Sequence, residues 1–356
     1  MRVVINGWFS GRAVGSGRYT DELLAALRQT APDDTFEAVT ARHPGPTWRK
    51  LAFEQLHFPR RARGADVAHV PYWAPPLRCT VPTVVTVHDL IPLVLPEYRR
   101  GVDARLYLEL VVRASRRAAA ILADSRHTAA DAVRLLGIPA ERVHVVPLGV
   151  GPPYGPLPAG TGSAEGHGFA LRLPERYGLY LGGFDPRKNL ATLFRAWRCV
   201  HAATGVPLVV AGGVPPPGAR LGEPPQQTAR RVGLPDEALV ITGTVAAADL
   251  PELYRRASVF AYPSHYEGFG LPPLEAMASG APVVVSSATS LPEVVGDAGL
   301  LVPPDDPERW VEALRRVLED HALAERLRRD GLSRAARFTW RETARRTRAV
   351  YAAVAA

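Results

Sequence analysis

The sequence predicts an α/β protein with two doubly wound domains in series, each built on a parallel sheet with helices on both faces. Short apolar runs alternate with longer helix-forming stretches along the chain, which is typical of strands buried on both faces. The 356 residues exceed the ~250 to 300 at which a single hydrophobic core stops growing. Residues 149–168 are rich in glycine and proline, carry no periodicity and form the expected linker.

The first domain is expected to begin with a strand at residues 3–5, a glycine-, serine- and arginine-rich loop at 6–17 and a helix over about 18–29. Further apolar runs predict buried strands at 36–39, 67–70, 83–87, 119–123 and 143–146. Helical stretches at 102–117 and 125–136 separate several of these strands. We therefore expect an N-terminal domain over residues 1–168.

The same alternation restarts after the linker. Apolar runs predict strands at 179–181, 208–210, 239–241, 259–262 and 283–285. Helices are expected at 190–201, 226–232, 248–256, 307–318 and 321–337, with a last one from residue 340. We expect a C-terminal domain over residues 169–339.

The composition is that of a globular protein, with 47% hydrophobic and 22% charged residues. The most apolar window, residues 81–95, is interrupted by His88 and Pro92 and falls short of the ~18 residues that a membrane-spanning helix needs. The N-terminal apolar run is too short for a signal peptide, so we expect a cytoplasmic protein, with peripheral contact at the inner face of a membrane left open. Cys79 and Cys199 lack metal-ligand spacing and indicate neither a disulfide framework nor a zinc site.

The net charge of +8 comes almost entirely from arginine. Arginines gather at three places in the first half: Arg60, Arg61 and Arg63, then Arg99 and Arg100, then Arg113, Arg116 and Arg117. Solvated surface faces explain such clusters, and so does an anionic partner such as a membrane surface or a phosphorylated acceptor. Nucleic acid is not expected, because the clusters are not interleaved with aromatic residues and match no binding module.

Polar residues stand where several predicted strands end. His88 and Asp89 directly follow the run 83–87, and Glu267 follows the run 259–262 after a short turn. Ligands of open parallel sheets bind outside the carboxyl ends of the strands, so these positions form the candidate site. We expect the two domains to face one another across a central cleft that holds these residues. A histidine at a strand end is also often a hydrogen-bonded structural residue, and both interpretations of His88 stay open.

The stretch 265–280, HYEGFGLPPLEAMASG, is predicted to be a glycine-rich turn followed by a helix. Gly268 and Gly270 let the backbone approach a ligand closely. Glu267 and Glu275 can accept hydrogen bonds from the hydroxyl groups of a sugar or a ribose, and the start of the helix attracts phosphate. The alternative is a surface loop with an acid in the first helical turn.

The stretch 184–190, FDPRKNL, places Arg187 and Lys188 directly before a predicted helix. Cations at this end of a helix oppose its dipole unless an anion binds, and a diphosphate forms strong charge-assisted hydrogen bonds with both. Lys188 and Lys50 are the two lysines of the chain, and this rarity indicates that a compact ammonium group is needed at position 188. A solvated pair of cations is the alternative.

The stretch 15–20, GSGRYT, is similar to a dinucleotide-binding fingerprint, but Thr20 stands where the third glycine belongs. A glycine loop near a ligand, with Gly15 and Gly17, fits equally well. The sequence has no G-x-S-x-G elbow for a nucleophilic serine and no Asp-x-Asp triplet to hold Mg²⁺ on a nucleotide diphosphate. We therefore expect neither a metal nor a cofactor.

The stretch 241–304 resembles the donor-binding half of the retaining glycosyltransferases of family 4, mannosyltransferase-like enzymes with the GT-B fold of two Rossmann-like domains. The family carries two glutamates with seven residues between them, here Glu267 and Glu275. YLGGFDPRKNL, TVHDLIP, ADSRHTAADAV and VHVVPLGV match the family as well, so the resemblance runs over residues 81–304. It implies that the N-terminal domain serves the acceptor and the C-terminal domain the donor, with a last helix, about 340–356, packing back onto the N-terminal domain.

The resemblance implies that Arg187 and Lys188 clamp the diphosphate of a nucleotide sugar and stabilise it as the leaving group. Glu275 holds the ribose hydroxyls. Some members carry an arginine where Gly183 stands, so the clamp here depends on the two cations of the PRK sequence.

For the transferred sugar, the resemblance assigns hydroxyl contacts to Glu267 in the second domain and to His88 in the first. His88, Arg187, Lys188 and Glu267 are thus the expected catalytic residues. Further donor contacts are expected from glycines and loop residues: Gly15, Gly17, Gly183, Gly268, Phe269, Gly270 and Leu271.

We expect a metal-independent, retaining glycosyltransferase that takes a hexose from a nucleotide-diphosphate sugar. GDP-mannose is the first choice of donor, with UDP- and dTDP-sugars next. The acceptor is expected to be a hydroxyl group of a glycan, a lipid-linked glycan or a small molecule, with residues 44–63 and the arginine clusters as candidate contacts. The alternatives are a nucleotide-sugar epimerase of the same fold, a non-catalytic nucleotide-sugar binding protein and, from the glycine fragment, a nicotinamide-dependent oxidoreductase.

Overall fold

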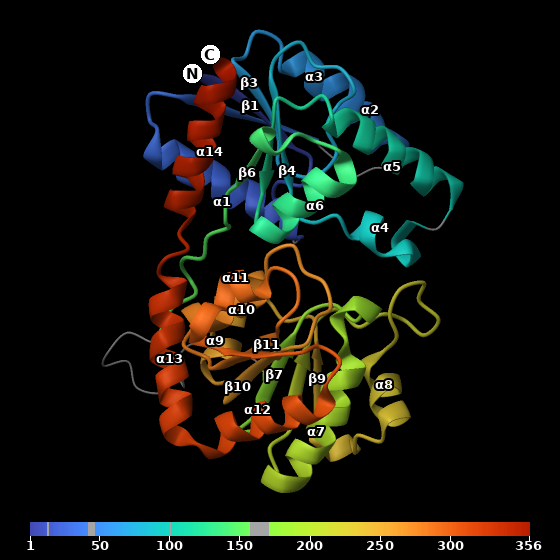
Figure 1. Cartoon of the computed structure of the whole chain (residues 1–356), viewed down its shortest axis with the longest axis vertical. Coiled ribbons are helices and arrows are strands. Elements are labelled where there is room, and N and C mark those ends of the chain that lie inside the picture. Colours follow the sequence, from blue (N-terminus) through green and yellow to red (C-terminus); the bar gives the residue numbers. More distant parts are fainter. Residues whose placement is uncertain (13, 42–46, 100, 157–170) are drawn as a thin grey trace. The chain divides into compact units, whose positions relative to one another are not determined.

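The computed structural model describes residues 1–12, 14–41, 47–99, 101–156 and 171–356. The chain forms two compact units, Met1–Gly149 with Phe338–Ala356, and Val150–Arg337 (Figure 1). Each unit contains one six-stranded sheet in which all paired strands are parallel. The predicted doubly wound α/β class is therefore confirmed. The predicted boundary between residues 168 and 169 lies outside the described residues and stays a prediction.

The first unit has the strand order β2-β1-β3-β4-β5-β6. These strands are β1 (Arg2–Gly7), β2 (Thr35–Thr40), β3 (Val67–Val70), β4 (Thr83–Val87), β5 (Ala120–Ala123) and β6 (Val143–Val145). The order reverses after β2, so right-handed crossovers place the helices before and after the reversal on opposite faces of the sheet. β4 and β5 are buried along their whole length, which explains their continuous apolar sequences.

Ten helical segments belong to the described part of the first unit. They are α1 (Gly15–Thr30), α2 (Thr47–Ala52), the π-helical η1 (Phe53–His57), α3 (Phe58–Arg61), α4 (Ile91–Val94), the 3₁₀ turn η2 (Pro96–Arg99), α5 (Val102–Ser115), α6 (Arg126–Leu136), the 3₁₀ turn η3 (Ala140–Arg142) and α14 (Trp340–Ala355). The expectation that residues 6–17 form a loop is wrong at both ends, because β1 runs to Gly7 and α1 begins at Gly15. Gly15 and Gly17 therefore lie in the first turn of a helix.

The last helix, α14, belongs to the first unit and packs against α1 (Figure 1). The Tyr351 hydroxyl lies 2.6 Å from Nδ1 of His69 on β3, and both residues are fully buried. Arg348 Nε donates to Asp34 Oδ2 at 2.6 Å, beyond the end of α1. The chain thus completes the first unit with its last residues.

The second unit has the strand order β12-β11-β10-β7-β8-β9. These strands are β7 (Gly178–Leu181), β8 (Leu208–Ala211), β9 (Leu239–Gly243), β10 (Val259–Tyr262), β11 (Val283–Ser286) and β12 (Leu300–Val302). The order reverses between β9 and β10, so the carboxyl ends of β7 and β10 lie side by side at the topological switch point. Ligands of doubly wound sheets bind at this point.

The helical segments of the second unit include three 3₁₀ turns and, near its end, a pair of long helices. They are η4 (Pro186–Lys188), α7 (Leu190–Thr204), α8 (Pro225–Val232), η5 (Asp236–Ala238), α9 (Leu250–Arg255), α10 (Leu271–Ala278), α11 (Leu291–Val295), η6 (Gly296–Ala298), α12 (Pro307–Glu319) and α13 (His321–Ala335). None of the described helices is long and apolar enough to cross a bilayer.

A fully buried tryptophan fixes β7 against its helix. Trp197 of α7 lies directly over Gly178, where an added Cβ would fall 2.0 Å from the indole ring. Its Nε1 donates to the carbonyl oxygen of Val206 at 3.1 Å. Because β7 leads straight into the loop with Arg187 and Lys188, this packing sets the position of that loop.

Candidate active site

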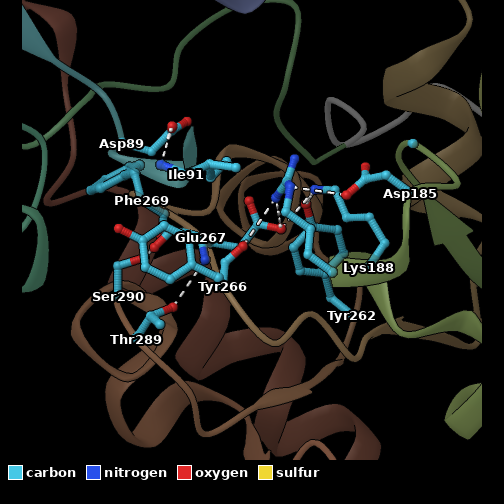
Figure 2. Close-up of polar contacts among 12 residues, drawn as sticks. Asp89, Ile91, Asp185, Lys188, Tyr262, Tyr266, Glu267, Phe269, Thr289 and Ser290 are labelled. Carbon is cyan, nitrogen blue, oxygen red and sulfur yellow. Dashed lines mark hydrogen bonds and ion pairs between the residues drawn. The ribbon is translucent and has the colours of Figure 1, made fainter. Parts of the chain in front are cut away.

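The loops after β7 and β10 meet in the second unit (Figure 2). Asn189, between η4 and α7, adopts a left-handed backbone with φ of 55°. Its Nδ2 donates to the carbonyl oxygens of Pro263 at 3.3 Å and Pro304 at 2.7 Å. One amide group therefore ties the loop after β7 to the loops after β10 and β12.

Arg187 and Lys188 form one charged cluster with Glu267 in this place; Figure 2 labels Lys188 and Glu267. Glu267 Oε1 accepts hydrogen bonds from Lys188 Nζ at 2.6 Å and from Arg187 Nη1 at 3.0 Å. Arg187 Nη1 also donates to the carbonyl oxygen of Tyr266 at 3.0 Å, and its Nε lies 3.1 Å from Asp185 Oδ1. The sequence placed the two cations and the glutamate in one site, and the structure brings them into direct contact.

The electrostatics of this cluster favour the ionised carboxylate. Burial alone would raise the pKa of Glu267, but the positive charges of Lys188 and Arg187 outweigh burial and hold the pKa below its usual range. Lys188 Nζ also donates to the Tyr262 hydroxyl at 2.6 Å and lies 4.8 Å from the centre of that ring. Lys188 is 6% exposed and Glu267 9%, so both charges are buried yet paired.

Two residues after β11 hold the backbone that carries Glu267. Thr289 Oγ1 accepts a hydrogen bond from the Glu267 amide at 3.0 Å, and Ser290 Oγ lies 2.8 Å from the carbonyl oxygens of both Glu267 and Phe269. Thr289 has φ of 53°, which is rare for a β-branched residue and costs on the order of 1 to 3 kcal/mol. The strained threonine indicates that the surrounding contacts determine the shape of this turn.

The turn ends where α10 begins. Gly270 precedes the helix with φ of 118°, a conformation that favours glycine, and an added Cβ would lie 2.7 Å from Leu291. Gly268, Phe269 and Leu271 surround it, so the backbone groups assigned to the donor belong to one continuous turn.

Glu275 lies further along α10 and is 4% exposed. Its Oε2 accepts a hydrogen bond from the Tyr254 hydroxyl of α9 at 3.0 Å. Burial raises the pKa of Tyr254, and the negative charge of Glu275 raises it further, so the tyrosine stays a neutral donor. The contact fixes the carboxylate that the family resemblance assigns to ribose.

His88 belongs to the first unit and pairs with a residue that the sequence did not single out. Its Nδ1 lies 2.7 Å from Oδ2 of Asp124, which follows β5, and its Nε2 lies 3.2 Å from the carbonyl oxygen of Pro71. Each ring nitrogen thus faces a hydrogen-bond acceptor. This arrangement requires either a proton on both nitrogens, or one proton on Nε2 and a second that Nδ1 shares with Asp124. Burial lowers the pKa of His88, but the charge of Asp124 outweighs it, so the pKa lies above its ordinary value.

The surroundings of this pair are largely buried. Asp124 is 2% exposed, and its Oδ1 has no hydrogen-bond partner among the residues that the structure describes. The ring of Tyr19 on α1 meets His88 edge to face, with 4.7 Å between centres. Asp89 Oδ1 accepts a hydrogen bond from the Ile91 amide at 3.1 Å, so this neighbour of His88 fixes the turn into α4 (Figure 2).

Gly15 and Gly17 lie in the first turn of α1. Val14, which precedes the helix, offers no side chain that caps it. An added Cβ on Gly17 would lie 2.4 Å from the carbonyl oxygen of Phe9 and 2.5 Å from that of Arg12, so only glycine fits. Asp21 accepts hydrogen bonds from the Ser10 hydroxyl and, at 2.8 Å, from the Gly11 amide. The start of a 16-residue helix is thereby kept close to the preceding turn.

Gly183 follows β7 at the same edge of the second unit, and its carbonyl oxygen accepts a hydrogen bond from Tyr180 at 2.5 Å. Among the described residues, no group of three or more histidine, cysteine, aspartate or glutamate side chains is arranged to hold a metal ion.

Several site residues escaped the sequence analysis: Asp124, Asp185, Tyr254, Tyr262, Thr289 and Ser290. Asp124 stands directly after an apolar run, and the rule that located His88 would have found it. Thr289 and Ser290 follow the run 283–285 only after a short turn. Tyr254 lies in a helix and Tyr262 inside an apolar run, so no local signal marks them as partners of Glu275 and Lys188.

Two family models match the chain. Glycosyltransferase Family 4 matches residues 15–152, and Glycosyl transferases group 1 matches residues 175–320. O-antigen chain mannosyltransferase B of Escherichia coli is 36% identical over 262 residues, which cover 72% of this chain and 66% of that protein. Serotype-specific mannosyltransferase WbdA of Escherichia coli is 33% identical over 265 residues, covering 74% of this chain and 32% of its own length. The chain thus spans two thirds of one relative and one third of the other. A D-inositol 3-phosphate glycosyltransferase of Xylanimonas cellulosilytica is 34% identical over 309 residues, covering 81% and 72%.

Solved structures share the architecture. Sucrose-phosphate synthase from Thermosynechococcus elongatus aligns with a TM-score of 0.75 and 23% identity over 99% of this chain and 98% of that one. Anabaena HepE in complex with UDP and glucose aligns with a TM-score of 0.72 and 18% identity over 99% and 100%. These neighbours confirm the expected GT-B fold class. Together with the family models and the curated relatives, they show that the chain belongs to family 4 of the glycosyltransferases.

Proposed function

We propose that the protein transfers a hexose from a nucleotide-diphosphate sugar to a hydroxyl group, with retention of anomeric configuration and without a metal ion. The observation that carries the proposal is the cluster of Arg187 and Lys188 on Glu267 at the switch point of the second sheet. A diphosphate placed there gains two charge-assisted partners, which also stabilise it as it leaves. The cluster is already neutralised in part by Glu267, which keeps two neighbouring cations in place before the donor binds.

In the proposed reaction the bond between the anomeric carbon and the diphosphate oxygen breaks. The acceptor oxygen bonds to the same face of that carbon, and its proton passes to the departing phosphate. Arg187 and Lys188 take up the charge that develops on the phosphate, while Glu275 holds the ribose and Glu267 with the 268–271 backbone orients the sugar. The proposal also assigns a sugar contact to His88 of the first unit, and contacts with the phosphates and the acceptor to Gly15 and Gly17.

GDP-mannose is the proposed donor, and the mannosyltransferase names of two Escherichia coli relatives support it. UDP-sugars come next, because HepE is described in complex with UDP and glucose. For the acceptor we propose a glycan, a lipid-linked glycan or a small molecule, held by the first unit. Residues 44–46 of the candidate acceptor segment 44–63, and Arg100 among the arginine clusters, lie outside the described residues.

A donor screen tests the proposal. GDP-mannose, UDP-sugars and dTDP-sugars are incubated with the protein and hydroxyl acceptors, and release of the nucleoside diphosphate is measured with and without a chelator. We expect turnover with at least one donor, unchanged by the chelator, and a product whose anomeric coupling in NMR matches the donor. Strict dependence on added Mg²⁺ contradicts metal independence. Epimer formation from donor alone indicates an epimerase, and binding without turnover indicates a nucleotide-sugar binding protein.

Lys188→Ala tests the phosphate clamp. Removal of one charged hydrogen bond is expected to cost on the order of 1.5 to 3 kcal/mol, which lowers kcat/KM for the donor by about 10- to 150-fold. Arg315→Ala is the control, because Arg315 of α12 pairs with Glu319 at 2.9 Å in the same unit and belongs to no proposed contact. Equal donor kinetics for both variants would remove Lys188 from the proposed clamp. Glu275→Ala is expected to raise the donor KM through loss of the ribose contact.

A further inference from the structure

A second site is suggested by a cavity of about 690 Å³ in the first unit, lined by α3, the end of α5 and the segment before β4. Its wall includes Thr83, the first residue of β4, whereas His88 follows the last residue of that strand. Five residues of parallel strand span about 16 Å, so the cavity lies at the opposite edge of the sheet from His88. The cavity therefore lies away from the strand ends to which the transfer reaction is assigned, although Arg60 and Arg63 also belong to the candidate acceptor segment 44–63.

The charged side chains that line the cavity all carry the same, positive sign. Arg60, Arg63, Arg78 and Arg117 line it, and none of its lining residues is acidic. Within the part of the chain that the structure describes, the guanidinium groups of Arg60, Arg63 and Arg78 have no hydrogen-bond or ion-pair partner. Gathered cations without a counter-charge repel one another, and a bound anion relieves this repulsion.

Apolar side chains supply much of the remaining lining, including Pro75, Pro76 and Leu77 of the segment before β4. Gln55 fixes the segment before β4, since its Nε2 donates to the Pro75 carbonyl oxygen at 3.3 Å and its Oε1 accepts from the Leu77 amide at 2.8 Å. Arg117 Nη1 donates to the carbonyl oxygen of Leu77 at 3.1 Å. Leu56, on the rim, is 53% exposed. The cavity therefore combines arginine side chains with apolar side chains on a segment that hydrogen bonds hold in place.

Another arginine-lined cavity of the same unit provides a contrast. It has a volume of about 670 Å³ and is lined by Arg99, Arg105, Arg113 and Arg116, but Glu109 stands among them. Arg116 Nε donates a hydrogen bond to the carbonyl oxygen of Leu136 at 2.7 Å. The two cavities thus have similar volumes and four lining arginines each, but only the second one is also lined by an acidic residue.

We propose that the cavity around Arg60, Arg63 and Arg78 binds a ligand that carries a phosphate group next to an apolar part. Guanidinium groups bind phosphate oxygens through two parallel hydrogen bonds, and three of them here have no competing partner among the described residues. The apolar lining residues, such as Leu56 and Leu77, receive the remainder of the ligand. A soluble phosphate compound and the headgroup of a lipid share this chemistry.

The experiment compares two triple variants of the full chain. Arg60→Gln/Arg63→Gln/Arg78→Gln removes three charges from the proposed site, and Arg99→Gln/Arg105→Gln/Arg113→Gln removes the same charge from the other cavity. One arm measures binding of inorganic pyrophosphate by equilibrium dialysis. A second arm measures sedimentation with phosphatidylglycerol vesicles, with phosphatidylcholine vesicles as the neutral blank. Because Arg187 and Lys188 are proposed to bind a diphosphate too, the pyrophosphate arm uses chains that carry Lys188→Ala.

We expect at least one probe to bind about tenfold more weakly to the first triple variant and within about twofold of the wild type to the second. Loss in the pyrophosphate arm identifies a soluble phosphate as the ligand, and loss in the phosphatidylglycerol arm identifies a lipid headgroup. Equal loss in both variants shows non-specific attraction to a basic surface and overturns the proposal. Wild-type binding by the first variant, or no binding by the wild type, overturns it as well. Circular dichroism confirms that both variants fold.

Discussion

Among single residues, Glu267 links the two cations of the charged cluster in the second unit, because one of its oxygens accepts hydrogen bonds from both Lys188 and Arg187. Two cations hold its pKa below the ordinary value, although burial acts in the opposite direction. Neutralising Glu267 leaves the buried Lys188 without its carboxylate partner, whereas Arg187 keeps Asp185. Removing one partner of a buried ion pair typically costs about 3 to 5 kcal/mol. Glu267→Gln is therefore expected to lower the free energy of unfolding at neutral pH.

The same carboxylate gives this effect a pH dependence. A carboxyl group with a lowered pKa in the folded state stabilises the fold above its unfolded pKa of about 4.3 and loses that contribution as the pH falls through the folded value. The difference in unfolding free energy between the wild type and Glu267→Gln should thus be largest at pH 7 and shrink below about pH 4.3. Urea denaturation over this range measures it, with Glu325→Gln, at a partly exposed pair, as the control. A difference that stays constant with pH would contradict the prediction.

His88 provides a second prediction at the residue scale. Its pKa is raised by Asp124, with a smaller contribution from Asp89, while burial lowers it. The other groups around His88 are the ring of Tyr19 and the neutral His69. Neither carries a charge, so Asp124→Asn removes only the charge of Asp124 from these surroundings. Asp124→Asn leaves burial as the dominant effect, so the His88 pKa should fall below the usual value of about 6.5.

NMR titration of the imidazole carbons measures this change. In the wild type, the His88 pKa should lie above 6.5, and in Asp124→Asn it should lie below 6.5. Asp89→Asn should lower the His88 pKa by a smaller amount. The signal is assigned by its absence from His88→Gln. An unchanged His88 pKa in Asp124→Asn would show that Asp124 does not hold the proton.

At the scale of elements, the first turn of α1 shows how two nearby glycines differ. An added Cβ on Gly17 meets two backbone carbonyl oxygens at 2.4 and 2.5 Å, whereas nothing lies within 4 Å of one on Gly15. Gly17→Ala is expected to displace the turn before α1 and to destabilise the fold by about 1 to 3 kcal/mol. Gly15→Ala should be neutral or slightly stabilising, because alanine favours a helix over glycine. Chemical denaturation of both variants measures the difference, and equal stabilities would show that the turn adapts.

Strands were the elements most easily predicted from the sequence. Val84, Val85 and Ile121 lie in continuous apolar runs because both faces of the sheet are covered, and this pattern is local. The positions after the strands could be predicted for the same reason, so the sequence placed His88, Lys188 and Glu267 beyond the ends of β4, β7 and β10, while their roles stay predictions. The start of α1 was missed because Gly15 and Gly17 are typical of loops, and the close approach of Phe9 and Arg12 that favours glycine is a tertiary contact.

The partners of the predicted site residues could not be predicted in this way. Tyr262 contacts Lys188 across 74 positions of the chain, and Asp124 contacts His88 across 36. Hydrogen bonds of this kind depend on which strands become neighbours, and a sequence pattern does not specify that pairing. The glutamates of the family motif were visible, but the residues that hold them belong to other elements.

At the scale of the whole molecule, the chain passes from the first unit to the second after Gly149 and returns after Arg337. The first unit is therefore completed by residues that follow the whole second unit. Within it, α14 covers α1, and Tyr351, fully buried, bonds His69 of β3. The four residues after Ala352 are exposed or half-buried at the end of the chain.

Two truncations test this dependence of the first unit on its last helix. A chain that ends at Arg337 lacks α14, so the apolar face of α1 and the ring of His69 lose their cover. We expect the amides of β1 and β3 to lose hydrogen-exchange protection, while those of β7 and β10 keep it, because the second unit has its own core. A chain that ends at Ala352 keeps Tyr351 and serves as the control, with protection expected throughout. Unchanged protection of β1 and β3 in the shorter chain would mean that the first unit folds without α14; loss in β7 and β10 as well would mean that the two units unfold together.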